Sequence, residues 1–298
     1  MFCVSVTNEE AAAQLILTTR VGTLTQNIYV QNTTQLTAIS INLVKDANRI
    51  YIARNVALTD VIVNSVMNNK LGELEVETYN GVNTPLCRFE MNKINQVNQI
   101  FFTGNFSEIL CNNLETIVFS LYINLGANIF SFPDLKYIGT QEFVSINGDI
   151  SNIWFAYINE VNFPKLEEVS RLDISGFYTN GILSFPSLKK IKKDLFSEYY
   201  GFVSHLDLPK LEYVKIIRIR PLMHDLNPII SMPSLKYCES FSIGTTGLSV
   251  NKVNAFYHQF LTVLPATGKQ IDLSEEVQPT GQGLLDKQIL INQGNIVY

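Results

Sequence analysis

One pattern of apolar and polar positions recurs along this chain. Each copy consists of an apolar residue, proline, any residue, leucine, two further residues and another apolar residue. The prolines, at positions 133, 164, 186, 209 and 233, stand 31, 22, 23 and 24 residues apart. Such a period is typical of a solenoid, in which each coil buries its apolar face against its neighbours. The copies are Phe132–Ile138, Phe163–Val169, Phe185–Ile191, Leu208–Val214 and Met232–Cys238.

The proline predicts the local conformation of each copy. Proline fixes its own φ and keeps the residue before it out of the helical region. We therefore expect that residue to be extended and directed inward, with one tight turn placing the leucine in the core. Segments after most copies alternate apolar and polar residues, as in a strand with one buried face. The predicted strands are Gln141–Ile146, Arg171–Ser175, Lys215–Ile219 and Ser240–Ile243. After Ile191, the run Lys192-Lys193-Asp194 gives no clear strand signal.

The periodicity continues upstream without the proline, in Cys111–Ile117 and Met91–Val97. Earlier strands are predicted at Leu36–Ile41, Arg49–Ile52, Asp60–Val63 and Glu73–Val76. They belong either to degenerate coils of the same array or to a separate small β-domain, and we favour continuous coils.

Both ends of the chain are predicted to be caps, because an open last coil would expose its core. A capping box at Thr7–Glu10 predicts a helix from Asn8 to about Thr19. Helical spacing from Val250 to Leu264 predicts a helix that Pro265 ends. After it we expect a strand, a second helix and a final strand, at Lys269–Leu273, Gly283–Asn292 and Asn295–Tyr298.

The predicted fold is therefore mainly β with short helices, an α/β solenoid of parallel stacked strands with helical caps. Its predicted regions are an N-terminal cap with degenerate β-rich coils (1–90), a repeat array (91–248) and a C-terminal cap (249–298).

Composition narrows the class of partner. Hydrophobic residues make up 46% of the chain and charged residues 16%, so Asn, Gln, Ser and Thr must cover much of the surface. A net charge of −5 and the lack of a Lys/Arg cluster argue against a nucleic-acid partner. No segment approaches the roughly 20 apolar residues of a spanning helix, and Met1–Val6 lacks signal-peptide features. We therefore expect a soluble protein made in a cytoplasm, without membrane insertion.

Residues that could carry chemistry are scattered. Cys3, Cys87, Cys111 and Cys238 form no CxxC pair and are predicted to be free thiols. The histidines, His205, His224 and His258, belong to no metal-ligand cluster. We therefore expect no metal, no cofactor and no catalytic residue, and hence no enzyme activity.

Three short motifs are given structural interpretations. The acidic pairs Glu167-Glu168 and Glu275-Glu276 are expected in turns on a solvated face. Gly281-Gln282-Gly283 is too short for a nucleotide-binding loop and is predicted to be a turn into the last helix.

The longest step between prolines contains an additional strand-like segment, Asn152–Ile158, with the only tryptophan. It is either an exposed aromatic binding patch or a coil without the proline motif whose alternate side chains fill the core, and we favour the second. The candidate binding residues are Trp154, Tyr157 and Tyr122.

The proline-leucine copies resemble leucine-rich repeats of the irregular kind seen in bacterial surface proteins and receptor L-type domains. The tail segments Thr267–Ser274 and Pro279–Val297 resemble the C-terminal cap of leucine-rich proteins of Bacteroidetes bacteria and their phages. The resemblance covers roughly residues 90–245 and 250–298. It implies a right-handed leucine-rich solenoid with a non-enzymatic binding or structural role.

The leading functional hypothesis is a virion structural protein of a phage, on the capsid or tail, because no signal segment is recognised. Its expected partners are other virion proteins or a host-surface glycan or protein, and the array could form a homo-oligomer. One alternative is a secreted or cell-surface bacterial adhesin. Another is a polysaccharide-acting enzyme, which would need two carboxylates at a fixed separation.

Overall fold

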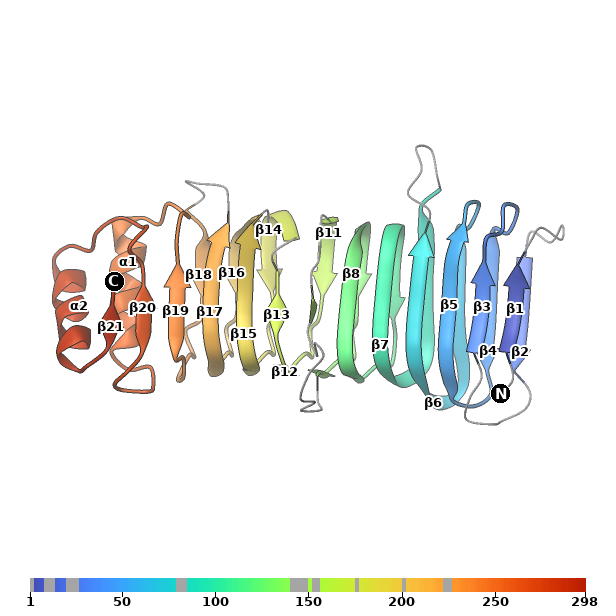
Figure 1. Ribbon diagram of the computed structural model, residues 1–298, viewed down its shortest axis with the longest axis horizontal. Helices are drawn as coiled ribbons and strands as arrows, with labels where there is room; N and C mark the ends of the chain where they lie inside the picture. The colour runs from blue at the N-terminus through green and yellow to red at the C-terminus, as the bar shows by residue number, and fades with distance from the viewer. Residues whose placement is uncertain are drawn as a thin grey trace. The chain divides into compact units, whose positions relative to one another are not determined.

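The computed structural model describes residues 3–7, 14–19, 27–78, 85–139, 150–151, 156–174, 177–199, 202–221 and 227–298. The chain divides into two compact units, Met1–Leu166 and Glu167–Tyr298. Each unit is a β-solenoid of parallel strands (Figure 1), which confirms the predicted mainly β solenoid. The regions predicted at 1–90, 91–248 and 249–298 stay predictions.

The first unit contains eleven described strands, which pair in parallel from coil to coil. In chain order they are β1 (Cys3–Thr7), β2 (Gln14–Thr19), β3 (Asn27–Gln31), β4 (Ala38–Leu43), β5 (Ala47–Asn55), β6 (Asp60–Thr78), β7 (Cys87–Cys111), β8 (Thr116–Ser131), β9 (Tyr137–Ile138), β10 (Ile150–Ser151) and β11 (Ala156–Asn162).

The second unit contains the remaining described strands and both described helices. In chain order they are β12 (Glu168–Val169), β13 (Leu172–Asp173), β14 (Phe177–Ser184), β15 (Lys190–Tyr199), β16 (Phe202–Asp207), β17 (Tyr213–Pro221), β18 (Ile229–Ser231), β19 (Ser240–Ile243), α1 (Val250–Phe260), β20 (Gln270–Asp272), α2 (Gln282–Asn292) and β21 (Ile296–Val297).

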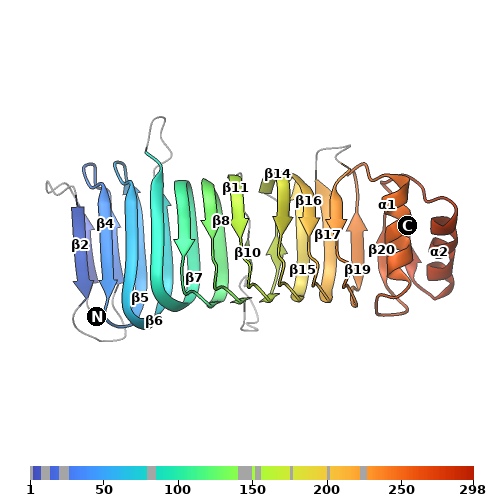
Figure 2. The same ribbon diagram turned by 180° about the vertical axis from the view of Figure 1, so that it is seen from behind.

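In the first unit, β1, β3 and β5 pair along one side of the solenoid, and β2 and β4 pair along the other (Figures 1 and 2). The long strand β6 joins the two sides, because its first part pairs with β4 and its second part with β5. Strand β7 continues both pairings of β6. The predicted upstream strands are therefore continuous coils of this array and not a separate β-domain.

The side chains that alternate inward along these strands form the core. Val30, Ile52 and Val76 occupy equivalent positions in successive coils and are fully buried. Since each is covered by the coil on either side, the coils stabilise one another as a stack.

In the second unit, β15, β17, β19, β20 and β21 pair in parallel on one side. Strands β14, β16 and β18 pair on the other side. Helix α1 packs on the end of the core, where Phe241 of β19 contacts Phe256 and Phe260. The two helices and the last two strands confirm the elements predicted near the C-terminus.

The proline motif forms the same turn in every copy. The backbone N–H of each leucine donates to the carbonyl of the residue before proline, at 3.2–3.4 Å. This bond closes a four-residue turn with proline second, the position that its fixed φ favours. The residue before proline and the leucine are buried in all five copies, which confirms that the motif supplies the core.

The helix predicted from Asn8 to Thr19 is wrong in its described part. Gln14–Thr19 is strand β2, which pairs with β4 from Gln14↔Ala38 to Thr19↔Leu43. A capping box is a local signal, and here the pairing of a β-prone segment with the next coil overrides it.

The segment after Ile191 was also predicted wrongly, since β15 runs from Lys190 to Tyr199 without a break. A register shift between Ile191 and Asp194 accommodates the polar run. Asp194 is buried and accepts hydrogen bonds from the guanidinium of Arg171 at 3.1 and 2.9 Å. The predicted strand at Gln141–Ile146 lies outside the described residues.

Candidate functional site

Of the three predicted binding residues, the structure places the side chain of one. Trp154 lies outside the described residues, and for Tyr157 the structure describes the backbone within β11. Tyr122 is half-buried on β8, and its ring centroid lies 6.0 Å from that of Phe101 on β7.

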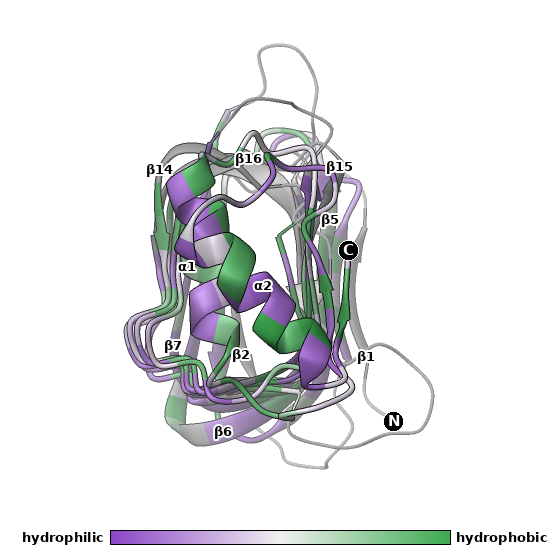
Figure 3. Cartoon of the chain, turned by 90° about the vertical axis from the view of Figure 1, so that its left-hand side faces the viewer, coloured by the Kyte–Doolittle hydropathy of each residue, from purple (hydrophilic) through white to green (hydrophobic). Residues whose placement is uncertain are grey.

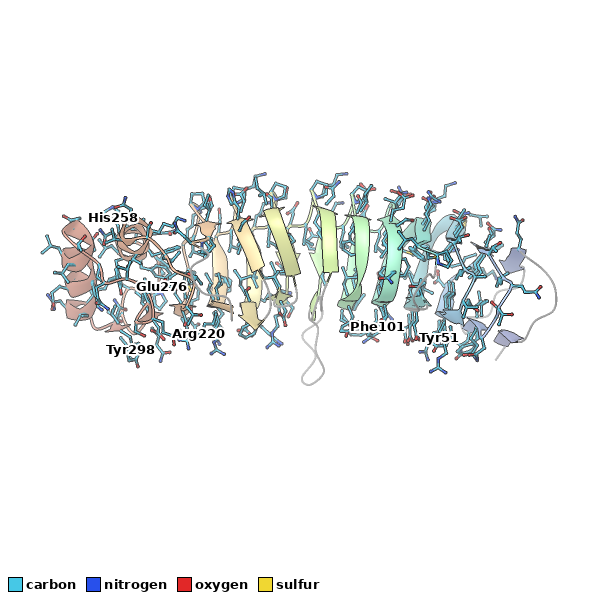
Figure 4. All side chains as sticks on the ribbon, turned by 90° about the horizontal axis from the view of Figure 1, so that it is seen from above. Tyr51, Phe101, Arg220, His258, Glu276 and Tyr298 are labelled. Atoms are coloured by element: carbon cyan, nitrogen blue, oxygen red, sulfur yellow. The ribbon has the colours of Figure 1, made fainter. Side chains whose placement is uncertain are left out.

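Tyr122 belongs to a line of outward-facing residues that runs across neighbouring strands of the first unit. Cα pairing aligns Tyr29 of β3 with Tyr51 of β5, and Tyr51 with Glu75 of β6. It then aligns Glu75 with Phe101, and Phe101 with Tyr122. Tyr51 and Phe101 point outward on the same side in Figure 4. We call Tyr29, Tyr51, Glu75, Phe101 and Tyr122 the aromatic column.

The aromatic column consists of two ring pairs with a charged group between them. Tyr29 and Tyr51 meet edge to face with centroids 6.0 Å apart, and Phe101 and Tyr122 are tilted at the same separation. Glu75 lies between the pairs and accepts a hydrogen bond from Arg49 at 2.7 Å.

Arg49 connects this carboxylate to the first ring pair. Its guanidinium carbon lies 5.2 Å from the ring centroid of Tyr51, and it forms a second ion pair with Glu73 at 3.2 Å. Burial lowers the pKa of Arg49, but the hydrogen bond that Arg49 donates to Glu75 and the charges of Glu73 and Glu75 more than offset this, so the pKa is raised. Burial, with the charges of Glu75 and Glu77, raises the pKa of Tyr51, so its hydroxyl stays a neutral donor.

The four strands that contribute a ring to the aromatic column share a signal that the sequence interpretation missed. The outward aromatic residue stands between two apolar residues of the sequence, in Ile28-Tyr29-Val30, Ile50-Tyr51-Ile52, Ile100-Phe101-Phe102 and Leu121-Tyr122-Ile123. Period-2 alternation assigns the middle residue to the outer face. An aromatic residue that recurs there in several coils would have identified the column.

The column can act in two ways. Cross-strand aromatic pairs stabilise a sheet by themselves. Partly exposed rings beside a carboxylate also suit a ligand that combines apolar faces with hydroxyl groups, because such a ligand can stack and donate hydrogen bonds at once.

The outward face of the second unit carries several arginine contacts. The ring of Phe196 lies between the guanidinium carbons of Arg171 and Arg218, at 5.1 and 5.6 Å from the centroid. Arg220 donates to Asp272 at 2.6 Å and to Ser242 at 3.0 Å. These arginines join neighbouring strands and so serve the fold.

The thiols are built into the core. Cys87, Cys111 and Cys238 are buried and unpaired, which confirms the prediction for these three. Burial raises the pKa of Cys87 and of Cys238 to about 12 and raises that of Cys111 as well. Thiols held in the neutral form are poor nucleophiles and poor metal ligands. Within the described part of the chain, no three His, Cys, Asp or Glu residues gather as a metal site.

The acidic pairs differ from each other. Glu167 and Glu168 are partly exposed and pair with lysines of the next coil, as expected for a solvated face, but Glu168 lies on β12 and not in a turn. Glu276 contradicts that expectation, because it is 7% exposed. Its carboxylate accepts hydrogen bonds from the N–H and hydroxyl of Thr246, at 2.7 and 2.9 Å, and from the N–H of Leu248 at 2.7 Å. It therefore holds the segment that leads into α1.

Two of the three histidines lie within the described residues. His258 lies on α1 with an exposed side chain, and its Nδ1 is 3.0 Å from the buried carboxylate of Asp286 on α2. His205 is half-buried on β16, and His224 lies outside the described residues. Gly281 is the N-cap residue that precedes α2 and has φ +52°, which confirms the predicted turn into this helix.

Neither described helix is long and apolar enough to cross a membrane. Comparison of the chain with protein-family models, with curated proteins and with solved structures finds no match.

Proposed function

We propose that this chain is a non-enzymatic structural protein of a phage virion, whose solenoid binds a glycan of the host surface through the aromatic column. The aromatic column is the observation that carries the proposal. The resemblance of the repeats and of the C-terminal segment to leucine-rich proteins of Bacteroidetes and their phages supports the virion setting.

The chemistry of the column matches that of a carbohydrate. A sugar ring has apolar C–H faces and a rim of hydroxyl groups, so it can stack on Tyr51 or Phe101 while a hydroxyl donates to Glu75. Tyr29 and Tyr122 lie on strands four steps apart, about 19 Å at roughly 4.8 Å a step. That length accommodates several sugar units in a row.

The charge of the site disfavours a nucleic acid. The chain carries a net charge of −5, and Arg49, which lies beside the column, is already paired with Glu73 and Glu75. A phosphate backbone needs several such cations.

Affinity electrophoresis of the purified chain in gels that contain host capsular or lipopolysaccharide glycans tests the glycan proposal. We expect wild type to be retarded by a host glycan, and Tyr51→Ala and Phe101→Ala to lose at least about tenfold in affinity, the usual loss for a central aromatic contact. Retardation that both variants retain in full would contradict the proposal.

Mass spectrometry of purified phage particles tests the virion setting separately. We expect peptides of this chain in stoichiometric amounts in the particles. Peptides found only in the host envelope, together with intact glycan binding, would favour the adhesin alternative instead.

A further inference from the structure

The first ring pair of the aromatic column holds a cation that this chain itself supplies. The guanidinium carbon of Arg49 lies 5.2 Å from the ring centroid of Tyr51. The same guanidinium pairs with Glu73 at 3.2 Å and with Glu75 at 2.7 Å. These glutamates stand two residues apart on β6, with the buried Leu74 between them, so both face outward. A ring beside two carboxylates is therefore the arrangement that holds a positive charge on this surface.

The second ring pair stands beside the same arrangement of carboxylates. Glu77 follows Glu75 by two residues on β6 and is half-buried. Cα pairing sets Glu75 beside Phe101 of β7 and sets Glu77 beside Thr103. Side chains two residues apart leave a strand roughly 6.6 Å from each other, so one small donor between them can reach both carboxylates.

The chain supplies no cation on this side of the column. Within the described part of β7 and β8, the outward positions around Phe101 are Gln99, Thr103, Ser120 and Tyr122, and all of them are uncharged. Strands β1 and β5 are labelled in Figure 3 on the side of the solenoid that carries these residues. The carboxylates beside Phe101 therefore face a ring and neutral polar groups.

The arginines of β5 do not neutralise this pair of carboxylates. Arg49 bonds Oε2 of Glu75, and Oε1 takes no part in that bond. Arg54 is exposed at a bulge of β5 across from Glu77, and among the described residues Glu77 takes part in no ion pair. Two carboxylates beside an aromatic ring attract a cation by charge and through the ring face, and they repel an anion.

We propose that this half of the aromatic column selects glycans that carry a free amino group. We call Glu75, Glu77, Phe101 and Tyr122 the ammonium subsite. An amino sugar can stack its C–H face on Phe101 while its ammonium donates to Glu75 and Glu77, as the guanidinium of Arg49 does one step along β6. The inference rests on the proposed glycan site and names the ligand class of that site. N-acetylation of the amine removes the charge, and an acidic sugar would be repelled.

Isothermal titration calorimetry of the full chain with three β-1,4-linked tetrasaccharides tests the subsite. The tetrasaccharides of glucosamine, N-acetylglucosamine and glucose share ring and linkage and differ in the group at C2. We expect the glucosamine tetrasaccharide to bind at least about tenfold more tightly than the other two, as for one hydrogen bond to a charged group. Added salt should reduce this preference, because the subsite is open to solvent.

Glu77→Gln assigns the preference to the subsite, because it removes one charge and keeps the size of the side chain. We expect the ratio of glucosamine to glucose affinity to fall to near one in this variant. Glu115→Gln is the matched control, since Glu115 precedes β8 outside the column and its side chain is 54% exposed. It changes the net charge by the same amount and should keep the ratio of wild type.

The outcomes separate the ammonium inference from the glycan proposal. Equal affinity of wild type for the three tetrasaccharides, or retardation by a host glycan without binding of the glucosamine tetrasaccharide, would overturn the ammonium inference alone. Absence of both kinds of binding would overturn both proposals. A preference that Glu77→Gln retains would overturn the assigned subsite. A tetramer of lysine that binds as tightly as the glucosamine tetrasaccharide would replace the amino sugar with a basic protein segment.

Discussion

Replacement of Glu276 by alanine should strongly destabilise the C-terminal end of the solenoid. The carboxylate of Glu276 is the acceptor for three buried donors, which belong to Thr246 and Leu248. Hydrogen bonds to a charged group stabilise by about 1.5–3 kcal/mol each, so three amount to about 4.5–9 kcal/mol. The alanine variant no longer has to bury a charged group, which offsets part of this loss. We therefore expect the free energy of unfolding to fall by about 3–5 kcal/mol in total.

The neighbouring glutamate is a matched control. The side chain of Glu275 is 44% exposed, and its carboxylate lies 3.9 Å from Arg220. Such a surface pair contributes less than about 1 kcal/mol, so Glu275→Ala should change little. Glu276→Gln keeps an acceptor toward Thr246 but sets an amide donor against the N–H of Leu248, so its loss should lie between those of the two alanine variants.

Guanidinium denaturation followed by circular dichroism measures these free energies of unfolding. Because coils are stabilised mainly by their neighbours, the C-terminal end can unfold in a separate first transition, and the loss would then appear in that transition. Equal losses for Glu275→Ala and Glu276→Ala, or a loss under about 1 kcal/mol for Glu276→Ala, would refute the reasoning.

Three further predictions follow from the core and the C-terminal cap. Leu211→Ala should cost about 2–5 kcal/mol in guanidinium denaturation, because the side chain is fully buried between coils; a cost below about 1 kcal/mol would mean that the motif leucine is not a core residue. Cys87 and Cys238 should not react with a thiol reagent until the chain is denatured. Burial raises the pKa of both thiols from 9.0 to about 12, so the stability that their buried neutral form contributes is complete below pH 9 and is lost as the pH rises toward 12. Gly283→Ala should destabilise the contact of α2 with α1, and Asn254→Ala should relieve much of that cost in a double-mutant cycle, whereas strictly additive effects would argue against the close approach.

The sequence was informative where the signal is local. The turn that places Leu211 in the core depends on proline chemistry within four residues, and the structure repeats it in every copy. The C-terminal helices were predictable for the same reason, since helical periodicity and Pro265 lie within one segment.

Errors arose where a distant coil decides the conformation. Strand β15 contains a run of charges that is typical of a loop, but Arg171, one coil earlier, neutralises the buried Asp194. Similarly, the capping box before β2 was overridden by pairing with Ala38 and its neighbours.

The candidate site was only partly predictable. Tyr122 was named in advance, but its alignment with Phe101 and Tyr51 depends on the register between coils, which bulges shift. The buried role of Glu276 depends on contacts with residues 28 and 30 positions away. The alternation of apolar and polar residues predicts which side chains point outward. Which residues of different coils lie side by side is known only from the strand pairing in the structure.

The most direct test of the account measures how tightly three proteins bind a host-surface glycan, as the dissociation constant of each. The proteins are wild type, Tyr51→Ala/Phe101→Ala and Tyr213→Ala/Tyr237→Ala. The last pair are stacked tyrosines of the second unit, with ring centroids 4.7 Å apart, and they control for the loss of aromatic surface in general. The account predicts binding by wild type and by the control, and a loss of at least about tenfold for the column variant. Equal binding by all three proteins, or loss in the control alone, would contradict it.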